Sequence, residues 1–337
     1  MPENGSRPAV AAMGDAIRAG DRRALARGIT LVESTRPDHR DDAIVLVESL
    51  LDETGGSIRL GISGPPGVGK STFIEAFGSL LTGEDHRVAV LAVDPSSSRG
   101  GGSILGDKTR MEHLGRDDAA FIRPSPSGGE LGGVARRTRE ALLLCEAAGF
   151  DVVLVETVGV GQSEIAVADL TDLFVLLASP TGGDDLQGIK RGIMELADLV
   201  VVTKADGDLA TAARQVCADL GQALHLLRPR HAELAPEAML VSSRTGAGVA
   251  EVWDAVAAAH AVLRQSGALD RLRSEQARRW LWSEVTDRLL HTLRDEPATA
   301  AVIAEVEAGI GSDALTPARA ARRILETWRR NAGTRHG

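Results

Sequence analysis

The stretch Ser57-Ile-Arg-Leu-Gly-Ile-Ser-Gly64-Pro-Pro-Gly-Val-Gly-Lys70-Ser-Thr72 decides the fold. Within it, an apolar run breaks into the pattern Gly64-x-x-x-x-Gly69-Lys70-Ser71, and apolar residues then return at helical spacing. A strand, a glycine-rich loop and a helix in this order are typical of a phosphate-binding loop, in which backbone N–H groups surround phosphate oxygens. The stretch therefore predicts a nucleotide site. A glycine-rich turn that binds nothing is the alternative, and the complete motif disfavours it.

The side chains of this loop have separate roles in phosphate binding. Lys70 reaches the terminal phosphates as a point charge and is therefore a catalytic candidate, while Ser71 offers a hydroxyl to Mg²⁺. We expect the loop to contact the nucleotide through Gly64, Pro65, Pro66, Gly67, Val68, Gly69, Lys70, Ser71 and Thr72.

Length and composition limit the class of protein. A chain of 337 residues can form one large α/β domain with helical additions, or two modest domains. It carries 38 basic and 47 acidic residues, a net charge of −9, without a basic block, which disfavours binding to nucleic acid. The cysteines Cys145 and Cys217 are isolated and lack histidine partners at metal spacing, so we expect both to be packing residues. The sequence has no secretory pattern and no membrane-spanning run, so we expect a soluble, cytoplasmic protein without a membrane partner.

Apolar runs alternate with helical patterns through the middle of the chain. Near-continuous apolarity predicts strands buried on both faces at 87–94 and 151–156, and further strands are predicted at 173–179, 199–203 and 238–242. Strands that alternate with helices form a mostly parallel, doubly wound sheet, and ligands bind at the carboxyl ends of its strands. The sequence therefore predicts an α/β fold of the P-loop NTPase class.

Helical patterns flank this domain on both sides. We expect an N-terminal helical extension at 1–55, whose segment 24–34 covers an edge or flank of the sheet, then a nucleotide-binding domain at 56–265 and a helical arm at 266–337. Beyond residue 248 the strand signal ends, and helices are predicted at 249–265, at 274–293 and from 316 onward. All four tryptophans lie in this last part.

The segment 274–293 carries an apolar stripe. Trp282, Val285, Leu289 and Leu293 share one side of the predicted helix, and Trp280 lies close by. So many large apolar side chains on one helix favour a protein interface; packing within the chain is the alternative.

Three carboxylates follow the phosphate loop in positions that suit a metal site. Asp94 and Glu156 lie at the ends of predicted strands, and Asp107 closes a long Gly/Ser loop. Taken singly, each is more often a cap or turn residue; together they predict Mg²⁺ ligation by Ser71, Asp94, Asp107 and Glu156. Gly159 follows Glu156 by three residues and could meet a γ-phosphate, so Glu156 and Gly159 join Lys70 as catalytic candidates.

A second motif indicates which base is bound. Asp206 in Lys204-x-Asp206 can accept two hydrogen bonds from the N1–H and N2–H₂ edge of guanine, a donor pair that adenine lacks, so GTP is favoured over ATP. Thr203 stands where the usual motif has asparagine. Ser242 and Ser243, before Arg244, are similar to the short loop of GTPases that meets guanine O6 through backbone N–H groups.

Several long motifs resemble one family, the MeaB/ArgK-type GTPases, which are chaperones of adenosylcobalamin-dependent acyl-CoA mutases such as methylmalonyl-CoA mutase. The similar segments span about residues 60 to 210 and are Gly64 to Ser71, Val93 to Ser97, Gly101 to Met111, Arg123 to Ser127, Glu156 to Glu164, Gly183 to Lys190 and Thr203 to Asp208.

The resemblance implies GTP and Mg²⁺ as cofactors, a homodimer formed by the C-terminal arm, and a mutase partner whose cobalamin is loaded, protected or reactivated. It also implies three switch segments, at 107–111, 156–164 and 182–190. Their candidate switch and partner residues are Lys108, Thr109, Arg110, Gln162, Asp184, Asp185, Gln187 and Lys190.

Two other functions are weaker alternatives. A GTPase for metal-centre assembly would need a Cys/His cluster, and the cysteines and histidines here are scattered. A P-loop kinase of a transport system is disfavoured because no kinase catalytic constellation or membrane segment appears, and an ATP-using small-molecule kinase would need an adenine site in place of Lys204-x-Asp206. In Ras-like GTPases a glutamine directly follows the second-switch glycine, whereas Gln162 is displaced from Gly159, so we expect slow intrinsic GTP hydrolysis that the partner mutase accelerates.

Overall fold

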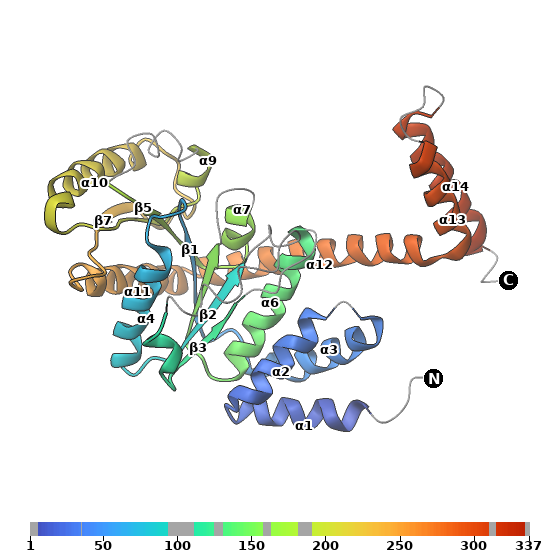
Figure 1. Ribbon diagram of the computed structural model, residues 1–337, viewed down its shortest axis with the longest axis horizontal. Coiled ribbons are helices and arrows are strands. Elements are labelled where there is room, and N and C mark those ends of the chain that lie inside the picture. Colours follow the sequence, from blue (N-terminus) through green and yellow to red (C-terminus); the bar gives the residue numbers. More distant parts are fainter. Residues whose placement is uncertain are drawn as a thin grey trace. The chain divides into compact units, whose positions relative to one another are not determined.

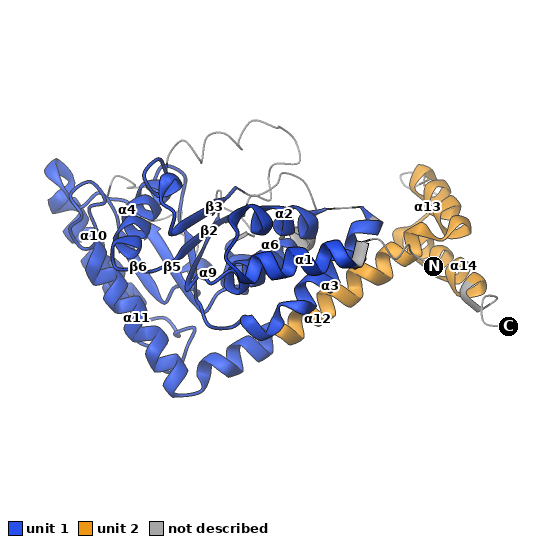
Figure 2. Cartoon of the chain, turned by 90° about the horizontal axis from the view of Figure 1, so that it is seen from below, with its two compact units in different colours: residues 1–276 blue, residues 277–337 orange. Residues whose placement is uncertain are grey.

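The computed structural model describes residues 6–34, 36–93, 111–124, 131–157, 163–180, 191–309 and 315–333. The chain separates into two compact units, residues 1–276 and 277–337 (Figure 2). The first unit contains the predicted sheet and the N-terminal helices. The second contains only helices among its described residues.

The first unit is built on a parallel sheet of seven strands in the order β3-β2-β4-β1-β5-β6-β7 (Figure 1). Every described strand pair is parallel, and β2, β4 and β5 are buried along their whole length. The predicted α/β architecture is therefore confirmed. The strands are β1 (Ile58–Ser63), β2 (Val88–Val93), β3 (Ala120–Arg123), β4 (Val152–Thr157), β5 (Leu173–Ala178), β6 (Leu199–Val202) and β7 (Glu237–Leu240).

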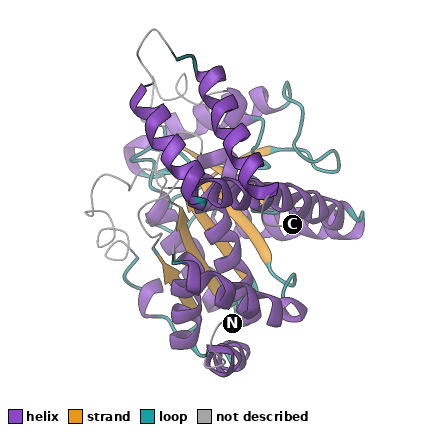
Figure 3. Cartoon of the chain, turned by 90° about the vertical axis from the view of Figure 1, so that its right-hand side faces the viewer, coloured by secondary structure: helices purple, strands orange, loops and turns teal. Residues whose placement is uncertain are grey.

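Helices cover both faces of this sheet, as Figure 3 shows. Alternate residues of a strand point to opposite faces, so Val88 and Val90 of β2 join one apolar core while Ala89 and Leu91 join the other. One core includes α4 and α11, and the other includes α2 (Arg22–Glu33), α6 and α10. The helices of the domain are α4 (Lys70–Gly83), α6 (Leu131–Ala147), α7 (Ser163–Ala168), α9 (Arg191–Met194), α10 (Ala210–Leu224), α11 (Val249–Gln265) and α12 (Ala268–Asp295), and its short 3-10 turns include η1 (Leu51–Glu53), η3 (Leu114–Arg116) and η4 (Gly207–Leu209).

The N-terminal extension consists of α1 (Ser6–Arg18), α2 (Arg22–Glu33) and α3 (Pro37–Ser49). Helix α2 packs on α6 and runs along the edge strand β3. Arg22 donates to the carbonyl of Asp117 at 3.1 Å, just before β3, and Arg123 at the end of β3 pairs with Glu33. The expectation that 24–34 covers an edge or flank of the sheet is confirmed, because α2 lies against α6 and bonds to both ends of β3.

Buried charges gather at the amino-terminal edge of the sheet, where β1 and β5 begin. Asp172 is fully buried and accepts the backbone N–H of Arg59 at 2.9 Å. Its two carboxylate oxygens also accept hydrogen bonds from Nε and Nη2 of Arg273, at 2.9 and 2.8 Å. Arg273 also donates to the carbonyl of Ser57 at 2.8 Å. The Arg59 guanidinium makes a second bidentate pair, in which Nε and Nη2 donate to the two carboxylate oxygens of Glu146 in α6, each at 2.9 Å. These contacts join the first turns of α12 to the residues that begin β5 and β1, and join β1 to α6.

His260 of α11 faces the same carboxylate. Its Nε2 lies 3.9 Å from an Asp172 oxygen, and its side chain is mostly buried. Burial lowers the pKa of the His260 imidazole; the Asp172 carboxylate opposes this shift, and the guanidiniums of Arg273 and Arg264 add to it. The folded protein therefore favours the neutral imidazole.

The second unit contains the end of α12 together with α13 (Pro297–Gly309) and α14 (Pro317–Gly333), which pack against each other. Arg323 of α14 and Glu305 of α13 form an ion pair at 2.6 Å. Helix α12 starts six residues before the predicted 274–293, and α13 was not predicted at all. None of the described helices is both long and apolar enough to span a membrane.

The Arg273 fork gives a prediction about stability. Arg273→Ala leaves the buried Asp172 charge uncompensated, so it should lower the free energy of unfolding by about 3–5 kcal/mol. Arg271→Ala, two residues earlier in α12, removes an exposed pair with Glu233 and should cost less than about 1 kcal/mol. Urea unfolding of the two variants makes the comparison, and equal losses would contradict the role of the fork.

His260 gives a prediction about pH. The unfolded chain protonates this imidazole near its usual pKa of about 6.5, whereas the folded chain resists protonation, so stability falls as pH drops below that value. The contribution has a slope of at most about 1.4 kcal/mol per pH unit, the value for one proton. His260→Gln should therefore lose less stability than the wild type between about pH 7.5 and pH 5.5. Parallel stability curves would show that His260 does not titrate in this way.

Candidate nucleotide-binding site

The phosphate loop leaves the carboxyl end of β1, between β4 and β5, and runs into α4. Gly64 has a φ of 158°, and a Cβ built there would lie 2.7 Å from the carbonyl oxygen of Leu177. Gly69 precedes α4 with a φ of 102°, in the left-handed region that favours glycine. These two glycines let the loop pass close to β5 and then enter the helix.

The loop leaves a row of backbone donors open. In the part of the chain that the structure describes, the N–H groups of Gly67, Gly69, Ser71 and Thr72 donate to no acceptor. They lie before or within the first turn of α4, where the helix dipole favours anions. Lys70 lies among them, with its Nζ 2.7 Å from the carbonyl oxygen of Gly64. The arrangement suits a phosphate chain.

The segment that follows β6 holds the other side of this loop. The hydroxyl of Thr203 donates to the carbonyl of Val68 at 2.6 Å, and Lys204 Nζ donates to the carbonyl of Gly67 at 2.7 Å. Thr203 is 2% exposed, and Lys204 has a φ of 57°, a left-handed conformation that costs a non-glycine residue about 1–2 kcal/mol. We call these two hydrogen bonds the loop clamp. The clamp therefore ties the carbonyls of Val68 and Gly67 to the segment after β6.

Asp206 lies just beyond the clamp. Its carboxylate is 21% exposed and lies 3.7 Å from the guanidinium of Arg244, a side chain that is 85% exposed. The backbone N–H groups of Ser243 and Arg244 have no acceptor among the described residues, while Ser242 is buried and its Oγ accepts the N–H of Thr245 at 3.2 Å. The Asp206 carboxylate can accept two hydrogen bonds from a base, and the N–H groups of Ser243 and Arg244 can donate to an acceptor on the same base.

Glu156 is the penultimate residue of β4 and is 4% exposed. It pairs in register with Ile62 of β1 on one side and with Ala92 of β2 on the other. The next residue, Thr157, shares a 2.8 Å hydrogen bond with Ser63, which directly precedes the phosphate loop. Glu156 is therefore one strand away from the loop, at the same edge of the sheet.

The remaining predicted site residues lie outside the described residues. They are Asp94, Asp107, Lys108, Thr109, Arg110, Gly159, Gln162, Asp184, Asp185, Gln187 and Lys190. The described part of the site thus brings together the phosphate loop, Glu156, the clamp, Asp206 and the 242–244 turn.

Sequence reasoning missed two features of this site. It assigned Thr203 to the nucleotide, whereas the Thr203 hydroxyl lies on the phosphate loop itself. It also gave no role to Arg244, the cation nearest Asp206 among the described residues. The threonine that replaces the usual asparagine was the available signal, because both side chains can donate one hydrogen bond to a carbonyl.

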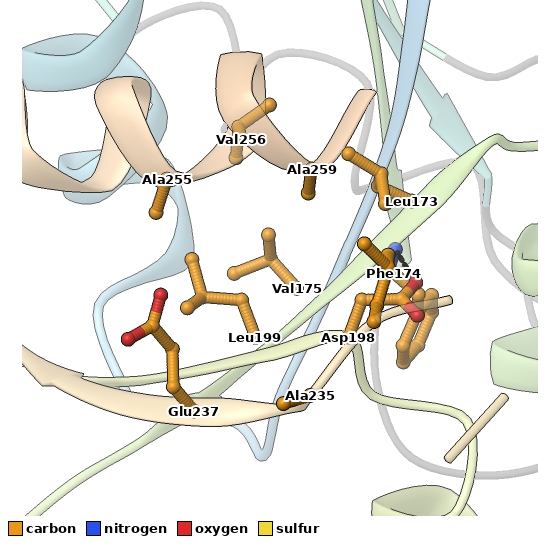
Figure 4. A pocket seen from close by; sticks show the side chains of 11 residues that line it. Leu173, Phe174, Val175, Asp198, Leu199, Ala235, Glu237, Ala255, Val256 and Ala259 are labelled. Atoms are coloured by element: carbon orange, nitrogen blue, oxygen red, sulfur yellow. Dashed lines mark hydrogen bonds between the residues drawn. The ribbon is translucent and has the colours of Figure 1, made fainter. Parts of the chain in front are cut away.

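A cavity of about 50 Å³ lies elsewhere, between β5, β6, β7 and α11 (Figure 4). Its walls include Leu173, Leu199 and Glu237 near the amino-terminal ends of these strands, together with Ala255 and Ala259 of α11. This is the opposite edge of the sheet from the phosphate loop. The cavity therefore belongs to a different part of the domain from the candidate nucleotide site.

Comparisons with known proteins agree with this geometry. The family model described as methylmalonyl Co-A mutase-associated GTPase MeaB matches residues 25–298. The GTPase ArgK of Escherichia coli is 50% identical over 82% of this chain and 84% of its own length. The mitochondrial methylmalonic aciduria type A homolog of Mus musculus is 49% identical over 92% of this chain and 77% of its own length. A solved structure described as a LAO/AO transport system kinase is 38% identical, has a TM-score of 0.74 and covers 97% of this chain and 99% of that one.

Asp206 gives a prediction about base preference. In Asp206→Asn a neutral amide cannot accept both donors of guanine, so GTP affinity should fall by about 10-fold to 100-fold while ATP affinity does not fall with it. Asp208→Asn, at an exposed position two residues further on, should leave both affinities unchanged. Fluorescent-nucleotide titrations of the three proteins make the test. A variant as selective as the wild type would show that this loop does not read the base.

Proposed function

This chain belongs to the MeaB family of methylmalonyl-CoA mutase-associated GTPases, and we propose that it hydrolyses GTP in the service of an adenosylcobalamin-dependent acyl-CoA mutase. The GTPase activity follows from the family. The observation that carries the proposed site is the loop clamp, because Thr203 and Lys204 join the predicted phosphate and base segments through direct hydrogen bonds.

The open donors fit a nucleoside triphosphate. The N–H groups of Gly67, Gly69, Ser71 and Thr72, together with the Lys70 ammonium, would hold the phosphate oxygens. The Asp206 carboxylate would accept from the guanine edge, and the N–H groups of Ser243 and Arg244 would reach O6. Guanine would have to displace the Arg244 guanidinium from Asp206. The exposure of Arg244 makes that inexpensive, since exposed ion pairs are worth about 0–1 kcal/mol.

The described residues also fit a magnesium ion. Ser71 supplies a hydroxyl at the start of α4, and Glu156 supplies a carboxylate one strand away, which are the oxygen ligands that Mg²⁺ prefers. When bound, the ion would neutralise charge on the phosphate oxygens. Asp94 and Asp107 are the further ligands that we propose from the sequence.

Phosphoryl transfer needs positioning and charge stabilisation more than covalent chemistry from the protein. Lys70 and the loop N–H groups would supply fixed positive potential to the terminal phosphates, as preorganised donors do in other active sites. Placement of the attacking water would depend on the three switch segments. We therefore propose that hydrolysis is slow in the free protein and faster when the partner braces these segments.

The proposed partner comes from the relatives. The matching family model is named for methylmalonyl-CoA mutase, and the mouse relative for methylmalonic aciduria. We propose that GTP binding and hydrolysis assist loading, protection or reactivation of adenosylcobalamin on such a mutase, in the cytoplasm. The 38% identical structure is described as a transport system kinase, so the alternative function is that of an ATP-using kinase. Asp206 and the 242–244 turn favour guanine over adenine.

We also propose a domain organisation for the chain. Residues 1–55 extend the GTPase domain of 56–265, and residues 266–337 form a dimerisation arm. Support comes from α12, which exposes large apolar side chains on its part beyond residue 276: Leu281 at 59%, Trp282 at 69% and Leu289 at 53%. Apolar side chains gathered on an exposed helix are typical of a protein interface.

The partner proposal gives a prediction about rate. Phosphate release by the free chain should be slow, and adding methylmalonyl-CoA mutase from the same organism should accelerate it by at least about tenfold, or roughly 1.4 kcal/mol of barrier. An equal concentration of an acyl-CoA enzyme that lacks cobalamin serves as the control. Fast hydrolysis by the free chain, or no response to the mutase, would refute partner-dependent activation.

The arm gives a prediction about assembly. The double variant Trp282→Glu, Leu289→Lys places unpaired charges in the proposed interface, which costs several kcal/mol, so light scattering should report a monomer. His291→Glu changes an exposed residue about half a helical turn away from this stripe and should remain dimeric. A wild-type protein that stays monomeric at high concentration would defeat the proposal.

A further inference from the structure

A carboxylate of α4 holds the segment that follows residue 110. Glu75 Oε1 accepts the backbone N–H of His113 at 2.7 Å and that of Leu114 at 3.3 Å. His113 precedes the short turn η3, whose first N–H groups have no side-chain cap of their own. The Glu75 carboxylate supplies this missing cap from another element. Hydrogen bonds of an ionised acceptor are roughly twice as strong as those between neutral groups.

A notch in the same helix holds the side chain of Leu114. A Cβ built at Gly78 would lie 2.6 Å from Cδ2, 3.0 Å from Cδ1 and 3.4 Å from Cγ of Leu114. Leu114 and Met111 are each 1% exposed and belong to the same apolar core as α4. Only a residue without a side chain at position 78 lets Leu114 approach the helix this closely.

These contacts fix one particular point of the chain relative to the phosphate loop. Helix α4 begins at Lys70, so Glu75 and Gly78 lie in the two turns that follow the phosphate-binding residues. Strand β2 ends at Val93 at the same sheet edge as the loop, and the next described residue is Met111 on α4. Val93 therefore lies at the sheet edge of the nucleotide site, and Met111 packs in the same core as the helix that carries the phosphate-binding residues.

We propose that Glu75 and Gly78 are positioning residues of the GTPase reaction, which hold residues 111–116 in register with the phosphate-binding turn of α4. In this role they act through the position of residues 111–116, which they contact directly. Neither residue belongs to the phosphate loop or to the switch segments. We call the contacts of Glu75 and Gly78 with residues 111–116 the anchor. The inference rests on the proposed function, because it assigns the anchor a part in GTP hydrolysis.

Gly78 allows a matched test within one helix. Gly78→Ala should displace Leu114, whereas Gly83→Ala, in the last turn of α4, meets no atom within 4 Å. Alanine favours a helix over glycine by about 1 kcal/mol, so neither substitution should unfold α4. We expect Gly78→Ala to lower kcat at least about tenfold, or roughly 1.4 kcal/mol of barrier, with KM for GTP within about twofold of the wild type. Gly83→Ala should keep both constants.

Glu75 allows a test by conservative rescue. Glu75→Ala should lower kcat in the same way, and Glu75→Gln should restore part of the rate because its amide oxygen still accepts an N–H. Hydrogen exchange measured by mass spectrometry on residues 111–116 reads the anchor directly. Exchange there should be faster in Glu75→Ala than in the wild type or Glu75→Gln, with and without a non-hydrolysable GTP analogue.

The outcomes separate the two proposals. A wild type that hydrolyses GTP while Gly78→Ala and Glu75→Ala keep its kcat overturns the positioning role alone. Unchanged exchange at residues 111–116 in Glu75→Ala also overturns it. A wild type that neither binds nor hydrolyses GTP overturns the proposed function and the positioning role with it.

Discussion

The site depends on the loop clamp, the two hydrogen bonds from Thr203 and Lys204 to the carbonyls of Val68 and Gly67. The buried Val68 carbonyl needs a donor, and both carbonyls receive a hydrogen bond from the segment after β6. The clamp occupies these two carbonyls, whereas the N–H groups of Gly67, Gly69, Ser71 and Thr72 have no acceptor among the described residues. One pair of contacts thus fixes the phosphate loop and the distance from it to Asp206.

Polar groups are divided between the two edges of the sheet. At the amino-terminal edge, the charges of Asp172, Arg273, Arg59 and Glu146 are paired with one another or with backbone groups. At the carboxyl edge, six backbone N–H groups have no acceptor among the described residues: those of Gly67, Gly69, Ser71 and Thr72 in and after the phosphate loop, and those of Ser243 and Arg244 in the 242–244 turn. Unsatisfied donors cost free energy unless water or a ligand meets them, so this edge is prepared to bind an anion and a base.

Sequence alone predicted what local patterns determine. The phosphate loop, the parallel strands and α11 follow from glycine spacing and apolar periodicity, and the structure confirms this fold. Contacts between residues far apart in the chain were not predictable: Thr203 bonds a carbonyl 135 residues away, and Arg273 bonds Asp172 across 101 residues. Helix α13 was missed because its alanine-rich segment lacks a clear apolar stripe. The Glu75 cap has no sequence signature, since any exposed helix carries such glutamates.

The central claim is that phosphate and base segments form one guanine-nucleotide site. Calorimetric titration of the nucleotide-free wild type with GTP and with ATP, both with Mg²⁺, tests it most directly. The account predicts one GTP per chain, bound at least about tenfold more tightly than ATP, because ATP would leave the Asp206 carboxylate without its donors. Equal affinity for the two nucleotides, or no binding of either, would contradict it.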